Sequence, residues 1–187
     1  MLIRETAVTV LDFETTGAVP GFDNEPWQIG LVVLRAGKID PASLFETLIC
    51  VDANRPFNAY APGKHHALRD AIAGAPPACT VWKNIEPLLA GPLAAHNVAV
   101  EKKFLRKMAP LHPYGPWIDT LKLARRAWPK APSHTLGDLV AGLNLEPRIR
   151  EFCPNHSAHD ALYDAVACAA LLEFLLQQNG WEDLEIM

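Results

Sequence analysis

The chain has 187 residues, of which 50% are hydrophobic and 20% are charged, and this composition excludes disorder and fits one well-cored domain over residues 1–187. Its net charge of −4 excludes a strongly basic protein that binds duplexes non-specifically. No apolar run reaches transmembrane length and no signal peptide opens the chain, so we expect a cytoplasmic protein that does not enter a membrane.

Three strands are predicted first, over residues 8–13, 27–34 and 44–51. They are apolar runs separated by segments that carry the turn formers Gly and Pro. Because the links between them are short, we expect an antiparallel meander.

Short strands and helices alternate in the rest of the chain. Strands are predicted over residues 92–96 and 117–119, and helices over about 64–73, 79–89, 100–108, 120–127, 135–143 and 161–178. This order predicts an α/β fold in which helices pack against a mixed sheet.

Asp12 and Glu14 close the first predicted strand. Side chains alternate along a strand, so both carboxylates should lie on one face, a few ångströms apart. Two carboxylates at the end of a buried strand repel each other unless a cation lies between them. We therefore prefer a site for a hard divalent metal to the alternative of a solvent-exposed strand end.

Thr15, Thr16 and Gly17 follow these acids directly. A glycine after two hydroxyl residues allows the backbone to approach a ligand, and free N–H groups can face an anion. We expect these three residues to contact the substrate.

Glu101 falls in the first turn of a predicted helix, where an acid alone merely complements the helix dipole. The preceding residues 94–97 favour a second interpretation, because they place a buried strand directly beneath the helix start. Glu101 is therefore a candidate metal ligand, and His96 and Asn97 are candidate substrate contacts.

His159 and Asp164 are five residues apart, so inside one helix their side chains would diverge by about 140°. They converge only if His159 lies on the loop before the helix and Asp164 in its first turns. Capping by Ser157 with Asp160 would start the helix earlier and misplace His159, and that alternative stays open. A histidine side chain titrates at about pH 6.5, which suits proton transfer from water.

Other clusters favour structural explanations. The four cysteines lack metal-finger spacing, and Cys168 falls in an apolar helical stretch, as expected of a reduced core thiol. Cys153, His156 and His159 lack a fourth zinc ligand at sensible spacing. The pair His65 and His66 is expected on the surface.

Basic residues follow two of the acidic segments, at residues 102–107 and 122–130. If Asp12, Glu14, Glu101 and Asp164 hold cations, 17 of the 21 acids remain, equal in number to the 17 bases. The bases either form a solvated helix face or contact phosphates. The tryptophans either fill the core or stack on bases, and the core is expected for most.

Three motifs in order carry a family resemblance: Asp-x-Glu-Thr-Thr-Gly at residue 12, His-Asn-x-x-x-acid at residue 96, and His-x-Ala-x-x-Asp-Ala at residue 159. Together they resemble the DEDDh-type 3′–5′ exonucleases, which include the bacterial polymerase proofreading subunit, ribonuclease T and oligoribonuclease. The resemblance runs from about residue 8 to residue 176. It implies a ribonuclease H-like fold, a mixed five-stranded sheet and two Mg²⁺ or Mn²⁺ ions.

The resemblance also implies roles for single residues. Asp12 would bridge both ions, Glu14 and Asp164 would complete the nucleophile-side site, and His159 would be the general base. The family's third acid is Asp, whereas this chain has Glu101, one methylene longer, so we expect activity that is reduced or prefers Mn²⁺.

The expected reaction is hydrolysis of single-stranded DNA or RNA from the 3′ end to nucleoside 5′-monophosphates, with the end preference coming wholly from the resemblance. The chief alternative is a catalytically weakened module that binds nucleic acid or protein, and a second is a phosphodiesterase for very short oligonucleotides. Residues 179–187 are too few for a polymerase-binding domain, which favours a stand-alone nuclease. A homodimer, as some relatives form, is left open.

Overall fold

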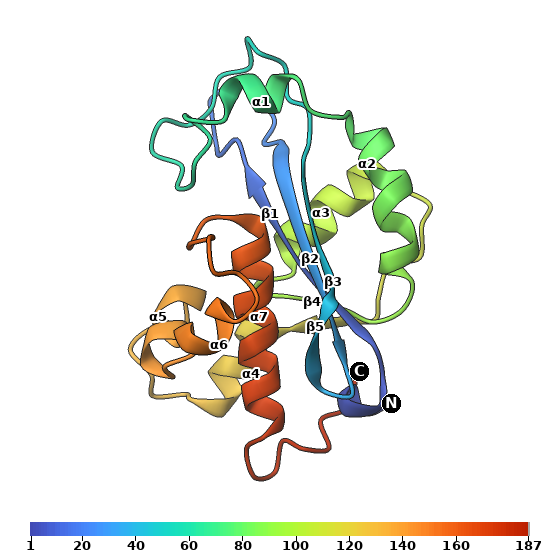
Figure 1. Ribbon diagram of the computed structural model, residues 1–187, viewed down its shortest axis with the longest axis vertical. Helices are drawn as coiled ribbons and strands as arrows, with labels where there is room; N and C mark the ends of the chain where they lie inside the picture. Colours follow the sequence, from blue (N-terminus) through green and yellow to red (C-terminus); the bar gives the residue numbers. More distant parts are fainter. Residues whose placement is uncertain (187) are drawn as a thin grey trace.

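The computed structural model describes residues 1–186 and shows a five-stranded sheet with helices on both faces (Figure 1). The strands are β1 (Val8–Thr15), β2 (Pro26–Arg35), β3 (Lys38–Leu48), β4 (Leu93–Ala95) and β5 (Trp117–Asp119), in the spatial order β3-β2-β1-β4-β5. β1, β2 and β3 pair antiparallel, whereas β4 runs parallel to β1 and to β5. The predicted mixed sheet, with three antiparallel strands first, is confirmed.

The helices cover the sheet in two groups. They are α1 (Arg69–Ala73), α2 (Ala78–Ile85), α3 (Ala99–Met108), α4 (Thr120–Ala127), α5 (Leu136–Gly142), α6 (Glu146–Arg150) and α7 (Ala161–Leu176), with single 3-10 turns η1 (Ile3–Glu5) and η2 (Glu86–Leu89). α7 crosses β1, β2 and β3 on one face, and α4, α5 and α6 pack on its outer side. No helix within residues 1–186 has the length and apolar content needed to cross a membrane.

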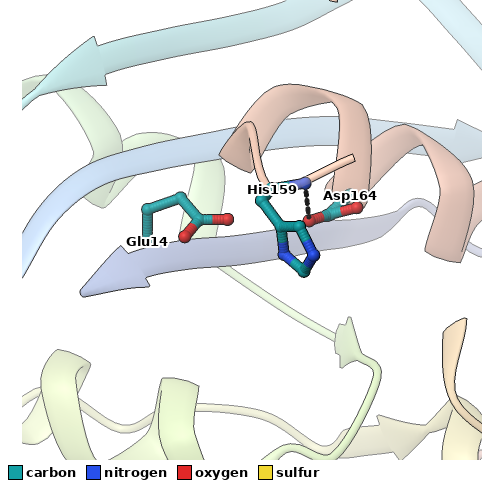
Figure 2. Close-up of side chains that lie close together, drawn as sticks. All are labelled: Glu14, His159 and Asp164. Carbon is teal, nitrogen blue, oxygen red and sulfur yellow. Dashed lines mark hydrogen bonds between the residues drawn. The ribbon is translucent and has the colours of Figure 1, made fainter. Parts of the chain in front are cut away.

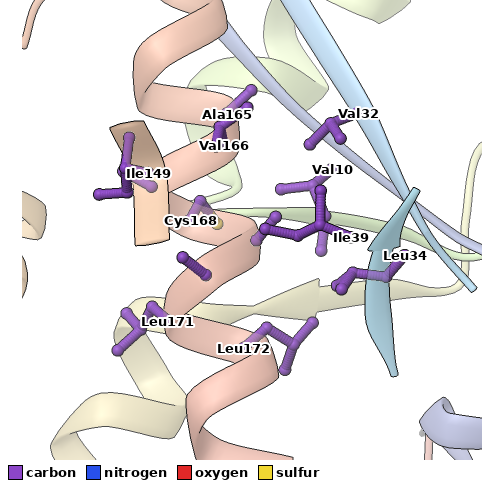
Figure 3. Close-up of a cluster of buried hydrophobic side chains, with 14 of the residues drawn as sticks. Val10, Val32, Leu34, Ile39, Ile149, Ala165, Val166, Cys168, Leu171 and Leu172 are labelled. Atoms are coloured by element: carbon purple, nitrogen blue, oxygen red, sulfur yellow. The ribbon is translucent and has the colours of Figure 1, made fainter. Parts of the chain in front are cut away.

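Side-chain alternation along β1 divides the core into two main clusters. Val8 and Val10 pack with α7 in the larger one (Figure 3), whereas Leu11 and Phe13 face α2 and α3. Because Asp12 is two residues from Val10 along the strand, its side chain projects toward α7. Glu14 follows on the same face, as expected from the sequence.

The third strand was predicted with the wrong bounds: the sequence indicated residues 44–51, whereas β3 spans Lys38–Leu48, starting and ending earlier. It starts directly after a tight turn at Ala36 and Gly37, both with positive φ. Pro41 interrupts the strand pattern because it cannot donate to a neighbouring strand, but β3 is an edge strand, where proline is tolerated.

Two predicted helices are shorter than expected, and one was missed. The helix predicted at 64–73 begins only at Arg69, because Lys64 and His65 form turns that contact other segments. The helix predicted at 79–89 ends at Ile85 and continues as a 3-10 turn, since Pro87 cannot donate an α-helical hydrogen bond. Helix α6 was missed, although a proline in its first turn is a known start signal.

Gly30 determines how closely α7 approaches the sheet. It pairs with Asp12 across β1 and β2, so it lies beside the predicted metal site. A Cβ atom at Gly30 would lie 2.3 Å from the backbone of Ala161, the first residue of α7. Only glycine therefore permits the start of α7 to rest directly on β2, one turn before Asp164.

We expect Gly30→Ala to destabilise the fold by about 1–3 kcal/mol or more, because the clash is with backbone that cannot rotate away. Urea unfolding measures this directly. Gly142→Ala is the matched control: a Cβ added there would have no atom within 4 Å, so its stability should change by about 0.5 kcal/mol or less. Equal stabilities for the two variants would contradict this account of the α7 contact.

Candidate active site

Asp12 and Glu14 lie at the carboxyl end of β1, where the pairing with β2 is irregular. Glu14 is 8% exposed, and Asp12 is half-buried. The sheet therefore carries two carboxylates into a largely desolvated position, as the strand pattern predicted.

His159 and Asp164 reach the same place from α7. The helix begins at Ala161, so His159 lies on the preceding loop and Asp164 in the first turn. The backbone N–H of His159 donates to Asp164 Oδ2 at 3.0 Å (Figure 2). The loop position expected for His159 is confirmed, and the alternative of an earlier helix start is wrong.

Glu14, His159 and Asp164 each offer a ligand atom, and these atoms lie within 4.8 Å of one another. Figure 2 shows Glu14 projecting from the strand while His159 and Asp164 come from the α7 end of the chain. Residues separated by about 150 positions in the sequence are thus brought into one group. The distances between their ligand atoms are compatible with binding to a common cation.

Glu101 completes the acidic cluster from α3. It lies in the first turn of the helix and is 3% exposed. Within residues 1–186, its Oε2 atom is buried and has no hydrogen-bond partner. A buried, unpaired carboxylate oxygen is unfavourable unless a proton or a cation satisfies it.

Burial is the main cause of the raised pKa values in this cluster. It raises the pKa of Glu14 to about 8, with further contributions from Asp164 and Asp160, and the pKa of Glu101 to about 8, with a contribution from Asp119. Burial raises the pKa of Asp164 to about 6 against the opposing hydrogen bond from His159.

Asp12 lies close to the other three carboxylates of the cluster. Its pKa is well above the ordinary range, first because of burial and then because of repulsion by Asp164, Glu101 and Glu14. Asp12 is therefore near enough to three other carboxylates to be repelled by each, one of them with an unpaired buried oxygen, and carboxylate oxygens are hard ligands suited to a divalent cation. The residues present therefore fit a divalent metal.

A cavity of about 710 Å³ opens beside these carboxylates. Asp12, His159 and Asp164 form its polar end, and α5 and α7 supply a largely apolar wall. Its remaining lining includes Leu136, Val140, Ala141, Tyr163 and Ala167. The cavity thus combines a charged end with a surface suited to a flat, partly apolar group.

The segment after Glu14 packs against a neighbouring loop. Thr16 is fully buried, and its hydroxyl contacts Asn24 Oδ1 and the Glu25 N–H, both at 3.1 Å. Gly17 has φ +71°, and a Cβ there would lie 2.8 Å from Asn58. The conformation required by Gly17 therefore serves loop packing, and Thr16 has no free surface for a substrate. Thr15 remains half-buried at the end of β1.

His96 lines the cavity, but both of its ring nitrogens are engaged. Nδ1 lies 3.0 Å from Thr120 Oγ1, and Nε2 lies 2.9 Å from the His134 carbonyl oxygen. Burial lowers the pKa of His96, so the ring is held neutral between these partners. Asn97 is exposed and has a φ of +76°, and its backbone N–H donates to Asp119 Oδ1.

Three other predictions from the sequence can be compared with the structure. His65 was expected on the surface, but it is fully buried and stacks on Phe57 with ring centres 5.5 Å apart. Cys153, His156 and His159 do not converge as a zinc site within residues 1–186; His156 instead joins Glu46 and Asp160. Cys168 is a buried free thiol in α7, as expected.

Sequence reasoning missed the contribution of the segment between β3 and α1. A Cβ at Gly63 would lie 3.1 Å from the His159 carbonyl oxygen and 3.4 Å from Glu14 Oε2. Lys64, which follows it, forms an ion pair with Asp160 at 3.6 Å. A glycine between a proline and a lysine resembles any surface turn, so no local signal marked this segment.

Comparison with known proteins identifies the family. A family profile described as "Exonuclease" matches residues 9–172, so the chain belongs to the exonuclease family. The DNA polymerase III subunit epsilon-like protein of Rhodobacter capsulatus is 30% identical over 164 residues, which cover 86% of this chain and 22% of that protein. Exodeoxyribonuclease 10 of Escherichia coli is 29% identical over 177 residues, covering 92% of this chain and 70% of that enzyme.

Solved structures agree on the fold. The nuclease domain of 3′hExo, described as a DEDDh family member bound to rAMP, superposes with a TM-score of 0.72 at 20% identity and covers 97% of each chain. Escherichia coli exonuclease I in complex with an oligonucleotide gives a TM-score of 0.66 at 14% identity, covering 93% of this chain and 41% of the other. The ribonuclease H-like fold and the family predicted from the three motifs are confirmed.

The raised pKa values predict how stability depends on pH and metal. The folded protein keeps protons on Glu14 and Glu101 up to about pH 8, whereas the unfolded chain releases them near pH 4.5. Their contribution should therefore make the metal-free protein less stable as pH rises from about 4.5 to about 8. Added Mn²⁺ should raise the melting temperature most at the upper end of that range.

Thermal melts in EDTA and in Mn²⁺ across this range check the prediction. Glu14→Gln removes one titrating group and should flatten the pH dependence in EDTA, while Glu5→Gln, at an exposed position, should not. Identical pH profiles for Glu14→Gln and the parent would contradict the contribution assigned to Glu14.

Proposed function

We propose that this chain is a metal-dependent 3′–5′ exonuclease that hydrolyses single-stranded DNA or RNA and releases nucleoside 5′-monophosphates. The observation that carries the proposal is the meeting of Asp12, Glu14, Glu101 and Asp164 in a desolvated cluster beside an exposed histidine. Family membership supports the reaction class, and exonuclease I in complex with an oligonucleotide supports a nucleic-acid substrate.

Asp12, Glu14, Glu101 and Asp164 would hold two Mg²⁺ or Mn²⁺ ions, since Asp12 lies near enough to each of the other three to be repelled by it. When bound, the ions would lower the pKa of an attacking water and stabilise the leaving 3′ oxygen. Glu101 supports this arrangement: although it is longer than the family's aspartate, its carboxylate is buried and influences Asp12. A degenerate binding module would not need to retain such an unfavourable cluster.

His159 would take the proton from the attacking water. Its side chain is exposed and lies within 4.8 Å of ligand atoms of Glu14 and Asp164. A general base needs that proximity together with access to water. The hydrogen bond from its backbone to Asp164 leaves the imidazole free for this role.

The cavity beside the cluster would accept the terminal nucleotide. Its apolar wall on α5 and α7, including Leu136, Val140 and Tyr163, suits the face of a base or sugar. The phosphate to be cleaved would then lie at the polar end, between Asp12 and Asp164.

Asp12→Asn should abolish metal-dependent hydrolysis, because it removes the proposed ligand that lies near the other three. The assay follows 5′-end-labelled single-stranded DNA and RNA of several lengths with Mg²⁺, Mn²⁺ or EDTA. Asp70→Asn, at an exposed position on α1, is the matched control and should retain parental activity. Parental activity in Asp12→Asn would refute the assigned site.

The product ladder in the same assay tests the direction and substrate length. A ladder shortened by single nucleotides from the 3′ end is expected, and internal cuts would contradict the exonuclease assignment. Cleavage confined to the shortest substrates would instead indicate a phosphodiesterase of short oligonucleotides. Absence of any metal-dependent product from the parent would favour the binding module.

His159→Ala should bind Mn²⁺ with parental affinity but lose about 10²–10⁴-fold in kcat, because it removes the proton acceptor and leaves the carboxylates in place. Mn²⁺ titration by electron paramagnetic resonance measures the first quantity, and single-turnover kinetics measure the second. Loss of metal affinity together with the rate would make His159 a ligand and exclude it as the base.

A further inference from the structure

The backbone at His159 is in an unusual conformation. Its φ is +63°, in the left-handed region that residues other than glycine rarely adopt. Such a residue keeps this conformation only where surrounding contacts fix it. One contact is its own hydrogen bond to Asp164, and the others come from the segment between β3 and α1.

That segment is itself firmly attached to the fold on the far side of Lys64. His65 is fully buried and stacks on Phe57, and the Arg69 guanidinium lies 4.0 Å from the centre of the same Phe57 ring. Arg69 also donates to the carbonyl oxygens of Ala53 and Arg55 at 2.8 and 2.9 Å. Lys64 therefore extends from a segment that is packed firmly against the rest of the fold.

Lys64 contacts the residue next to His159. Its ammonium lies 3.6 Å from Asp160 Oδ2, and the Asp160 side chain is 10% exposed. Gln28 of β2 binds this loop from the side of the sheet. Its side-chain amide donates to Asp160 Oδ1 at 3.4 Å, and its Oε1 accepts from the Ala161 N–H at 3.3 Å. Asp160 is thus held between the sheet and Lys64.

Gly63 brings its backbone close to the same arrangement. Its φ is +99°, and a Cβ there would come within 3.1 Å of the His159 carbonyl oxygen. The chain at residues 63 and 64 consequently lies close to His159 and forms an ion pair with Asp160. Neither Gly63 nor Lys64 is a proposed metal ligand.

We propose that Lys64 is a positioning residue: its ion pair with Asp160 holds the loop at residues 159 and 160 against the anchored segment at residues 63 and 64, and thereby fixes the imidazole of His159 beside the proposed metal-binding carboxylates. The inference rests on the proposed function, in which His159 takes a proton from water. A displacement of about 1 Å in a reacting group can lower a rate by about 100-fold, so loss of this contact should lower kcat.

The first test is the steady-state kinetics of Lys64→Met on a short single-stranded oligonucleotide. We expect kcat to fall by about 10- to 100-fold with KM changed less than about twofold, because the base is misplaced while the binding cavity remains. Lys64→Arg should recover most of the rate by retaining the charge. Lys83→Met, at an exposed position on α2, is the matched control and should behave as the parent.

A double-mutant cycle tests whether Lys64 acts through Asp160. Asp160→Asn keeps the shape of the side chain but removes its charge, so it should reduce kcat to a similar extent. If the ion pair is the working contact, Lys64→Met with Asp160→Asn should be no slower than the slower single variant. Rate losses that multiply, or a change confined to KM, would overturn the proposal and indicate a direct substrate contact.

Hydrogen exchange of the His159 amide provides a readout that does not need catalysis. This amide donates to Asp164, so the metal-free parent should protect it, and Lys64→Met should lower that protection by at least about tenfold while melting at the parental temperature. Unchanged protection would overturn the proposed positioning. An inactive parent with the expected loss of protection would instead refute the nuclease assignment and leave the positioning contact standing.

Discussion

The repulsion of Asp12 by three other carboxylates is the constraint on which the rest of the site depends. Asp12 is repelled by Glu14, Glu101 and Asp164, and the four come from three separate elements of the fold. Folding brings them together because each is attached to a packed element: β1, the start of α3 or the start of α7. The hydrophobic clusters on the two faces of the sheet thus support an arrangement that electrostatics alone opposes until protons or cations are bound.

Close backbone contacts give the site its shape. Gly30 lets the first turn of α7 rest on β2, which places Asp164 beside Asp12. Gly63 brings a second segment against His159 and Glu14. Neither glycine offers a side chain to a metal, yet each determines how near the ligands and the proposed base can come. The spacing of the site residues therefore depends on packing as well as on the acidic residues themselves.

Local sequence patterns predicted where Asp12, Glu14 and His159 lie but not the contacts that hold the site together. Period-two alternation placed Asp12 and Glu14 on one face, and the helical angle required His159 to lie on a loop; both are properties of a single segment. Thr16 and Lys64 depend on partners outside their own segments, Asn24 with Glu25 in one case and Asp160 in the other. Their roles could not be read without the tertiary fold. The burial of His65 escaped prediction for the same reason, since Phe57 covers it.

The central claim is that these carboxylates share bound cations, and the most direct measurement is anomalous diffraction from crystals soaked in Mn²⁺. The account predicts two Mn²⁺ peaks, both contacting Asp12, with Glu14 and Asp164 on one ion. Glu101 should reach the cluster directly or through a water. Crystals in saturating Mn²⁺ with no peak at Asp12, or with the carboxylate of Glu101 turned away from the cluster, would contradict it.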